Sequence, residues 1–479
     1  MNLRNHALRV RLETARARVG PLELAVGLGA GLVAVAGTVG ADSRWLAALG
    51  RLIVHRGSVP NGIPYASAPS AGWHNVPVLA ELILHWLTSA GGDRGLLAAQ
   101  VVAVTVALAV LALSLRREEA DDLGAALVLL VVAVGALPAL VIVRSQLFSL
   151  LLFPVLIALL RAEARAPSGR IWLLPLLLAL WSNLHGAVLV GLLVSAAYLV
   201  LSRAPRQPLV AAGVLVASAL AVCATPALQH TPQYYSSLLQ NEAARSGEGL
   251  WAPISFTSGF DLLLVAAAVT LLVLALRARP PLWETIVLAA LAVLTVKTAR
   301  SGVWLLFFAA APAARSLRLG PARDWRFAGA ALVVTCVIAA LGFVRGPLPS
   351  GASAPVLDEA LRRADGTAIL AEGVAAEQVA LAGGRVWMSN PLDAFSDRNQ
   401  RLYLDWLAGR PAGDAALRHA PRVVLVTTGG AAAKRLAHSR AFRATAGDER
   451  ATLYVRRSAR LRANPVEGRV RPRPLAVVA

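Results

Sequence analysis

Apolar runs separated by short polar links cover the chain up to Val344. A membrane-spanning helix needs about 20 apolar residues, and a shorter run spans when its flanking residues extend it. The pattern therefore predicts transmembrane helices over Leu22–Ala41, Leu96–Leu115, Leu123–Val143, Leu147–Leu160, Ile171–Trp181, Ala187–Leu201, Leu209–Ala224, Phe260–Leu276, Leu282–Val296, Val303–Ala314 and Phe327–Val344.

The run Val76–Ala90 is different, because His74, Glu81, His85 and Thr88 recur at helical spacing as a polar stripe beside apolar positions. With this run outside the membrane, the cytoplasmic loops hold more than twice as many Lys and Arg residues as the outer loops; with it spanning, the excess moves outside. The positive-inside rule therefore predicts about eleven spans, a cytoplasmic N-terminus, an extracytoplasmic C-terminus and a surface-lying or re-entrant helix over Val76–Ala90.

This orientation gathers the unusual polar groups on one side of the membrane. The cytoplasmic loops are short and basic, whereas the outer side receives Asp42, His74, Glu81, Arg144, Gln146, Asn183, His185, the loop Thr225–Gly259, Lys297 and Arg300. We therefore expect any chemistry to be extracytoplasmic.

The composition becomes less apolar after Val344. The predicted organisation is a basic cytoplasmic leader over 1–20, a transmembrane domain over 21–344 with an external loop over 42–94, a linker over 345–355, an extracytoplasmic α/β domain over 356–457 and a disordered basic tail over 458–479. The fold class is thus an all-α polytopic membrane protein with a small extracytoplasmic α/β C-terminal domain.

Periodicity also predicts the elements of the α/β domain. Helices are expected over Val356–Ala364, Ala375–Ala382, Asn399–Leu407, Asp414–His419 and Ala431–His438. Extended segments are expected over Thr367–Leu370, Arg385–Met388 and Val423–Thr427, with a hairpin of Phe442–Ala446 and Ala451–Val455.

Composition narrows the class of protein. With 57% hydrophobic and 15% charged residues, the chain is not an ordinary soluble domain. The net charge of +20 would suggest nucleic acid in a soluble chain, but the Arg residues here punctuate apolar runs, so no nucleic-acid partner is expected. Cys223 and Cys336 lie inside apolar runs, which argues against a disulfide framework or a thiolate metal site. The excess of Arg and Ala over Lys and Ile is typical of a GC-rich bacterial genome, so we expect a bacterial inner membrane protein.

The stretch Trp181-Ser182-Asn183-Leu184-His185-Gly186 lies between two apolar runs. Polar groups at membrane depth need partners. One interpretation is a turn, in which Asn and Gly bend the chain and Trp anchors at the interface. The other is that Asn183 and His185 face a water-filled outer cavity and contact a ligand.

Asp42 directly follows the first predicted span, where a carboxylate is a general base, a metal ligand or a helix-end residue. Glu81 and His85, one helical turn apart, are spaced to share a divalent metal with Asp42, so a divalent metal remains an open alternative. The external loop that follows Asp42 contains the segment 50–65, which we expect to be a loop ordered by its Pro and Gly residues.

Cationic side chains end two of the predicted spans on the outer side. Arg144 and Gln146 lie at one end, and Lys297 and Arg300 at another. Such cations bind a substrate phosphate, with Arg giving bidentate contacts, or anchor the helix ends to anionic headgroups of membrane lipids.

The order of these features carries a family resemblance. A basic leader and a span precede Asp42, Gly57-Ser58-Val59-Pro60, Trp73-His74 and Glu81-Leu82; then come Arg144-Ser145-Gln146-Leu147-Phe148-Ser149, the Trp181–Gly186 string, and Arg300 before Phe307-Phe308. Over roughly Leu22–Val344, the chain resembles the bacterial GT-C superfamily of membrane glycosyltransferases, the group similar to protein mannosyltransferases and lipid A aminoarabinose transferases.

The resemblance implies a polyprenyl-phosphate sugar donor and a general base in the first external loop. Asp42 would deprotonate an acceptor hydroxyl on a glycan, lipid or protein, Arg144 and Arg300 would neutralise the departing phosphate, and Asn183 and His185 would orient sugar or phosphate. Many members carry paired acids near this position, whereas a Ser and an Arg follow Asp42 here.

The remaining candidates and alternatives complete the prediction. Glu81 is the second catalytic candidate, and His74, Gln146 and Lys297 join the expected substrate-binding residues. A transporter or flippase of lipid-linked glycans is one alternative, and a non-catalytic membrane assembly protein is another. Transporters often carry inverted repeats and binding sites near the midplane, so the one-sided polar groups and the lack of a detectable repeat favour the enzyme.

Overall fold

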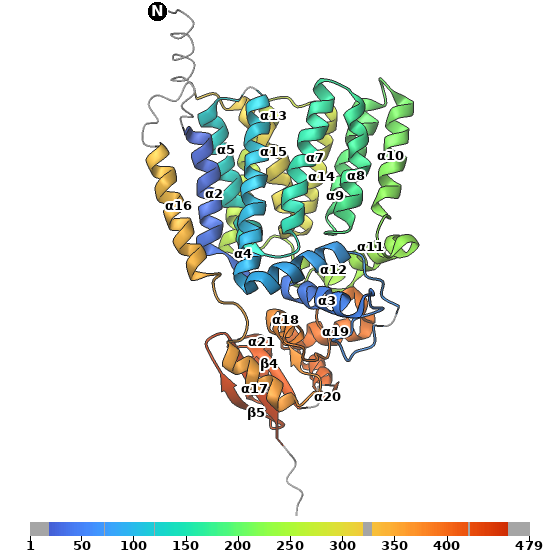
Figure 1. Cartoon of the computed structure of the whole chain (residues 1–479), viewed down its shortest axis with the longest axis vertical. Coiled ribbons are helices and arrows are strands. Elements are labelled where there is room, and N and C mark those ends of the chain that lie inside the picture. Colours follow the sequence, from blue (N-terminus) through green and yellow to red (C-terminus); the bar gives the residue numbers. More distant parts are fainter. Residues whose placement is uncertain (1–18, 71, 119, 320–327, 420–421, 458–479) are drawn as a thin grey trace, which may run out of the picture.

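The computed structural model describes residues 19–70, 72–118, 120–319, 328–419 and 422–457. The predicted tail over 458–479 and all but the last two residues of the predicted leader over 1–20 lie outside these ranges. Figure 1 shows a bundle of long helices above a smaller unit that contains strands, with shorter helices lying across the boundary between them.

Apolar helices form at every run that the hydrophobic pattern predicts to be transmembrane. Four helices within the described ranges are long and apolar enough to cross a membrane: α4 (Val78–Arg117), α7 (Leu147–Arg165), α13 (Gly259–Arg277) and α16 (Ala328–Arg345). The shorter ones are α2 (Pro21–Ala36), α5 (Asp122–Gly135), α8 (Leu173–Ser182), α9 (Val188–Tyr198), α10 (Pro208–Val222), α14 (Leu282–Lys297) and α15 (Gly302–Ser316). The helical membrane architecture is as predicted, and the count of about eleven spans stays a prediction.

Two predicted spans are too long at their outer ends. Helix α2 ends at Ala36, and residues Thr38–Val39 form strand β1. Helix α5 ends at Gly135, and a short helix α6 (Leu137–Val141) leads into strand β2 (Ile142–Val143), which pairs in parallel with β1. Because Val39, Ile142 and Val143 are as apolar as the helix residues before them, hydropathy could not separate these strands from the spans.

Helix α4 bends sharply at Gly92, whose φ of 55° and ψ of −139° are not helical. Only glycine adopts such a conformation readily. The half before the bend lies across the lower ends of the bundle helices, and the half after it rises into the bundle (Figure 1). This arrangement agrees with a surface-lying helix over Val76–Ala90 followed by a separate span over Leu96–Leu115.

A helix that was not predicted from the sequence packs on the half of α4 before this bend. Residues Ser43–Arg56 form α3, so the prediction of a loop from Gly50 onward is wrong until Gly57, whose left-handed backbone ends the helix. A Cβ on Gly50 would lie 2.1 Å from the carbonyl oxygen of Glu81. Glycine therefore lets α3 approach the backbone of α4 closely.

The same lower layer holds short helical segments from other loops at this end of the bundle. They are η3 (Leu228–His230), α11 (Thr231–Gln240), α12 (Glu242–Ser246), η4 (Gly249–Trp251) and η5 (Ala299–Ser301). At the opposite end of the bundle lie η1 (Gly169–Trp172) and the π-helical turn η2 (Leu199–Arg203).

The C-terminal unit is a small α/β fold. Its elements are α17 (Ala354–Ala364), β3 (Leu370–Ala371), α18 (Gly373–Leu381), η6 (Leu392–Ala394), α19 (Asp397–Leu407), η7 (Pro411–Ala415), α20 (Ala416–His419), β4 (Val423–Thr427), α21 (Ala431–Ala437), β5 (Phe442–Gly447) and β6 (Ala451–Arg456). The sheet order is β3-β4-β6-β5, with β3 parallel to β4 and the predicted hairpin of β5 and β6 antiparallel.

The segment Arg385–Met388, predicted to be extended, makes isolated bridges and belongs to no regular strand. Only Val386 makes bridges, to Ile369 on one side and to Ala66 of the external loop on the other. A segment that joins two different parts of the chain in this way has no regular ladder, although its apolar residues are buried as those of a strand would be.

The hydrophobic core of the C-terminal unit continues into the external loop. Trp45, Ala48 and Leu49 of α3 pack in one buried cluster with Val379, Trp387 and the sheet. Ala47, on another face of the same helix, belongs to the core of the bundle. Helix α3 therefore lies between the bundle and the C-terminal unit, and both fix its position.

The topology is testable by cysteine accessibility in a background with Cys223 and Cys336 changed to Ala. We expect single cysteines at Arg165 and Arg318 to react with a membrane-impermeant maleimide only after the cells are opened, and a cysteine at Asp397 to react in intact cells. The opposite result at position 397 would place the C-terminal unit in the cytoplasm and would remove the basis for an extracytoplasmic site.

Candidate functional site

The pairing of β1 with β2 brings Asp42 to Arg144. Parallel strands leave a sheet at the same edge, so the residues that follow each strand become neighbours. The Gly40 N–H donates to the Val143 carbonyl at 3.0 Å, and the Ser43 hydroxyl donates to the same carbonyl at 2.8 Å. A Cβ on Gly40 would lie 2.3 Å from a methyl group of Ile142, so this approach requires glycine.

Asp42 occupies the N-cap position of α3 with a φ of 82°, a left-handed conformation that is uncommon outside glycine. Its side chain makes no cap hydrogen bond. Instead, the carboxylate accepts from the Asn390 side-chain amide at 3.1 Å. Burial raises the pKa of Asp42, while the positive charges of Arg144 and Arg300 oppose this shift.

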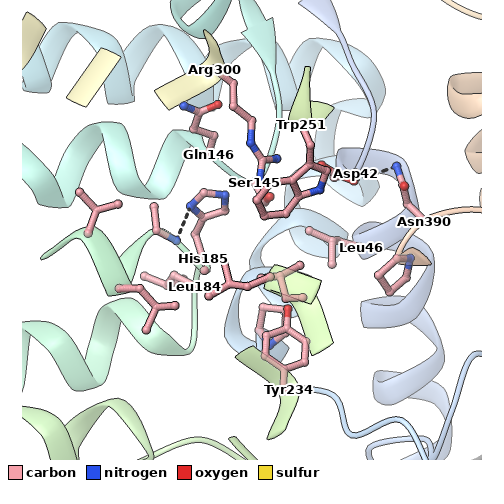
Figure 2. A pocket seen from close by; sticks show the side chains of 18 of the residues that line it. Asp42, Leu46, Ser145, Gln146, Leu184, His185, Tyr234, Trp251, Arg300 and Asn390 are labelled. Carbon is pink, nitrogen blue, oxygen red and sulfur yellow. Dashed lines mark hydrogen bonds between the residues drawn. The ribbon is translucent and has the colours of Figure 1, made fainter. Parts of the chain in front are cut away.

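A cavity of about 260 Å³ opens beside Asp42 (Figure 2). Its polar lining includes Asp42, Ser145, Gln146, His185, Tyr234, Arg300 and Asn390. Its apolar lining includes Leu184, Leu189, Val190, Leu238, Leu239 and Leu294, and indole rings come from Trp45, Trp73, Trp251 and Trp304. A second cavity of about 330 Å³ is lined by Arg144 and shares Arg300 with the first.

Arg144 and Arg300 carry charges that no acidic side chain within the described ranges pairs by an ion contact. The Arg300 guanidinium lies over the Trp251 ring, 4.2 Å from its centroid, and projects between His185 and Trp251 in Figure 2. The Nε of Arg144 is buried and has no hydrogen-bond partner among the described residues. A buried donor without a partner is costly, so both cations are suited to receive an anionic ligand.

Other buried arginines of the bundle are paired. Arg161 binds Glu284 at 2.9 Å and also donates to a backbone carbonyl, and Arg203 binds Glu163 at 3.1 Å. All four of these charged side chains are at most 4% exposed. Single nitrogens of Arg161 and Arg203 also lack a hydrogen-bond partner, so the contrast lies in the ion pairs. Acids neutralise these two arginines, whereas none within the described ranges pairs with Arg144 or Arg300.

A chain of hydrogen bonds fixes the orientation and tautomer of His185. The Trp181 indole N–H donates to the Ser149 hydroxyl at 2.6 Å, and the same hydroxyl lies 2.7 Å from His185 Nδ1. The Ala187 N–H also points at Nδ1, at 3.3 Å. Nδ1 is therefore an acceptor, and Nε2 carries the proton on a ring that lines the cavity.

Four of the residues predicted from sequence line the first cavity: Asp42, Gln146, His185 and Arg300. Arg144 lines the second cavity beside them. In the stretch Trp181–Gly186, the imidazole of His185 reaches the cavity. Trp181 lies outside the cavity and holds the Ser149 hydroxyl that contacts His185.

The other predicted site residues lie elsewhere. Asn183 donates to the carbonyls of Ala179 and Ala224, at 2.8 and 2.7 Å, so its amide serves the turn. The His74 ring stacks on His230 with centroids 3.9 Å apart, in a separate cavity of about 190 Å³. Lys297 is exposed and lines neither cavity beside Asp42.

Glu81 is also separate from the cavity. It is fully buried, and both carboxylate oxygens accept from the Asn75 amide, at 2.8 and 2.7 Å. His85 contacts Ser89 instead of a second acid. Over the part of the chain that the structure describes, no three His, Cys, Asp or Glu side chains are arranged to hold a metal ion, so the predicted sharing of a metal with Asp42 does not fit.

Several candidate functional residues were not predicted from the sequence because they lie in segments far along the chain from Asp42. Glu377 of α18 accepts from the Asp42 backbone N–H at 2.6 Å, and Asn390 binds the Asp42 carboxylate. Asp393 accepts from the Trp73 indole N–H at 2.8 Å, and burial raises the pKa of Asp393 to about 6. No local pattern marks these residues, since their role depends on the return of the chain to the external loop.

The hydrogen-bond chain behind His185 yields a stability prediction. In Ser149→Ala, the buried Trp181 N–H loses its acceptor, which typically costs about 1–3 kcal/mol. We expect a lower thermal unfolding temperature of the detergent-purified protein. The control is Ser195→Ala, because Ser195 is equally buried but donates only to the carbonyl of Gly191 in its own helix. Equal unfolding temperatures for the two variants would show that the chain is energetically unimportant.

Of the comparisons with known proteins, the one with solved structures identifies a similar fold. No family model and no curated protein matches the sequence. Among solved structures, the chain is similar to ArnT from Cupriavidus metallidurans, crystallised bound to undecaprenyl phosphate, with a TM-score of 0.51 and 12% sequence identity. The match covers 91% of this chain and 97% of ArnT. The chain therefore has the fold of ArnT, which confirms the GT-C-like fold that the sequence resemblance implies.

Proposed function

We propose that this protein is a membrane glycosyltransferase that moves a sugar from a polyprenyl-phosphate donor to an acceptor hydroxyl on the extracytoplasmic side, with Asp42 as the general base. The observation that carries the proposal is the single cavity lined by Asp42 and by Arg300, a guanidinium without an acidic partner among the described residues. It combines an acceptor for a proton with a cation for a leaving phosphate.

The lining of the cavity fits an amphipathic donor. Arg300, Gln146 and His185 provide polar contacts on one part of the wall, whereas leucines and valines provide an apolar surface on another. A lipid phosphate needs both, because its charge requires paired donors and its chain requires apolar contact. The undecaprenyl phosphate bound to ArnT, which has the same fold, supports this class of ligand.

The proposed reaction is an inverting transfer. Asp42 takes the proton of the acceptor hydroxyl while that oxygen attacks the anomeric carbon of the sugar. The bond from this carbon to the phosphate oxygen breaks, and its electron pair stays on the phosphate. Arg300 and Arg144 stabilise the charge that develops there, and His185 offers its Nε2–H to a sugar or phosphate oxygen.

The electrostatic setting of Asp42 suits this role. Burial raises the pKa of Asp42 and thus strengthens it as a base, whereas Arg144 and Arg300 favour the ionised form that must accept the proton. Glu81 has a different setting, with both oxygens bonded to Asn75 away from the cavity. We assign Glu81 the support of the external segment rather than proton transfer.

The phosphate contacts are testable by binding. We expect Arg144→Ala and Arg300→Ala each to weaken binding of undecaprenyl phosphate to the purified protein, because truncating a charge-assisted contact in a dry site typically costs about 2–5 kcal/mol. The matched control is Arg206→Ala, an exposed arginine at the other end of the bundle that donates only to the carbonyl of Ser202. Unchanged affinity in both site variants would leave these arginines as headgroup anchors.

The base is testable by turnover. Asp42→Asn keeps the size and polarity of the side chain but removes the basic lone pair, so turnover should fall by about 10²–10⁴ with little change in donor binding. Glu81→Gln should reduce turnover less. If Glu81→Gln abolished transfer while Asp42→Asn remained active, the two roles would be reversed. If neither change mattered in a folded protein that binds the donor, the transporter interpretation would replace the enzyme.

A further inference from the structure

We propose that the C-terminal unit is a working part of this site: Glu377 and Asn390 are positioning residues that set the backbone and the carboxylate of Asp42. The inference rests on the proposed function, since it concerns the base of that reaction. It goes beyond that function because it gives the C-terminal unit a catalytic task.

At the N-terminus of α3, the Glu377 carboxylate caps the helix in place of the Asp42 side chain. An aspartate at the N-cap position ordinarily accepts from the backbone N–H of the third helical residue, which here is Trp45. That N–H instead points at Glu377 Oε2 at 3.4 Å, and the Asp42 N–H donates to Glu377 Oε1 at 2.6 Å. Because Glu377 supplies the cap, the Asp42 carboxylate is free to line the cavity.

The second support is the backbone of Asp42 itself. A non-glycine residue at a φ of 82° is strained and persists only where its surroundings hold it. Its N–H is held by Glu377 and the next residue, Ser43, by the carbonyl of Val143. Glu377 is fully buried between the two units, so its contact is shielded from water.

The third support is the anchoring of Asn390. The amide of Asn390 donates to the Asp42 carboxylate at 3.1 Å, and Asn390 also lines the cavity. The segment just before it is fixed on two sides: the Ala68 N–H donates to the Trp387 carbonyl, and the Trp387 N–H donates to the Ile369 carbonyl, both at 2.9 Å. The donor to Asp42 is therefore held by the external loop and by the C-terminal unit together.

Different charges surround the carboxyl groups of Asp42 and Glu377, and they favour Asp42 as the base. Glu377 faces Asp42 and the Arg44 guanidinium, which is itself paired with Asp93 at 2.7 Å. Asp42 faces Arg144 and Arg300.

Burial and the negative charge of Asp42 raise the pKa of Glu377 to about 8. Near neutral pH, the negative charge of the pair therefore lies mainly on Asp42, which is the member that touches the cavity.

The activity test uses the full-length protein in detergent with a polyprenyl-phosphate sugar donor. We expect Glu377→Ala to lower kcat about 10²-fold, because small misplacements of a catalytic group cost that much, and to leave KM for the donor within about threefold. Glu377→Gln keeps the acceptor for the Asp42 N–H and should restore most of kcat. The matched control is Glu372→Ala, which removes a carboxylate that accepts from the Thr427 N–H inside the same unit.

The dependence of turnover on pH distinguishes a positioning role of Glu377 from a contribution to stability alone. In the parent protein, ionisation of Glu377 beside Asp42 strengthens the base, so turnover should rise through an inflection near pH 8. This inflection should be absent in Glu377→Gln. A normal kcat in Glu377→Ala would overturn the proposal, and so would an equal loss in Glu372→Ala that follows thermal stability.

An activity-independent readout keeps this inference distinct from the proposed function. Carbodiimide labelling of Asp42, mapped by peptide mass spectrometry across pH, follows the protonation of that carboxyl. The Asn390 amide stabilises the charged form, so in Asn390→Ala the labelling midpoint should move to higher pH by about half a unit to one unit.

The labelling results distinguish a failure of the proposed transferase activity from a failure of the proposed positioning role. A parent protein without transfer activity but with this shift would refute the glycosyltransferase and retain the positioning role. An unchanged midpoint in Asn390→Ala would refute the positioning role.

Discussion

The arrangement of the bundle end that carries Asp42 depends on one electrostatic constraint: two guanidinium groups and one carboxylate meet in a partly buried space without pairing fully. Arg300 rests on the Trp251 ring, and Arg144 leaves its Nε unbonded, although acids such as Glu284 and Glu163 neutralise buried arginines elsewhere. Buried charge without a partner is costly, so it persists only where the fold over-determines the geometry. The strand pair β1–β2 and the cap by Glu377 supply that rigidity.

Local pattern predicted the helical runs well and their outer ends poorly. Hydropathy over a run such as Leu22–Ala41 reports how apolar the residues are, whereas the switch from helix to strand at Thr38 depends on Ile142, far away in the chain. Helix α3 was missed for another reason: its sequence is amphipathic, but Gly50 and the Pro- and Gly-rich residues from Gly57 onward favoured a loop.

For the candidate site as well, local sequence pattern identified some of the residues that line the cavity and also selected residues that do not. Asp42, His185 and Arg300, three of the residues singled out from the sequence, line one cavity, and each is a polar group that ends an apolar run. Asn183 is also a polar residue at the end of an apolar run, but its side-chain amide donates to two backbone carbonyls of the turn. Residue type and position in a run therefore identify which groups need partners, and only the fold decides whether the partner is the protein or a ligand.

The contact between Asp42 and the C-terminal unit has a consequence for how the site forms. Glu377 and Asn390 are separated from Asp42 by more than three hundred residues, and the last bundle helix, α16, lies between them in the chain. The bundle alone therefore has the two arginines and His185 but lacks the groups that contact the backbone and carboxylate of Asp42. Because Trp45 and Leu49 of α3 share a buried core with the C-terminal unit, loss of that packing would also release the helix that begins at Asp42. Apolar burial between the two units and the geometry of the Asp42 carboxylate are thus coupled through one helix, so a mutation that loosens the interface should displace this carboxylate before it affects the bundle.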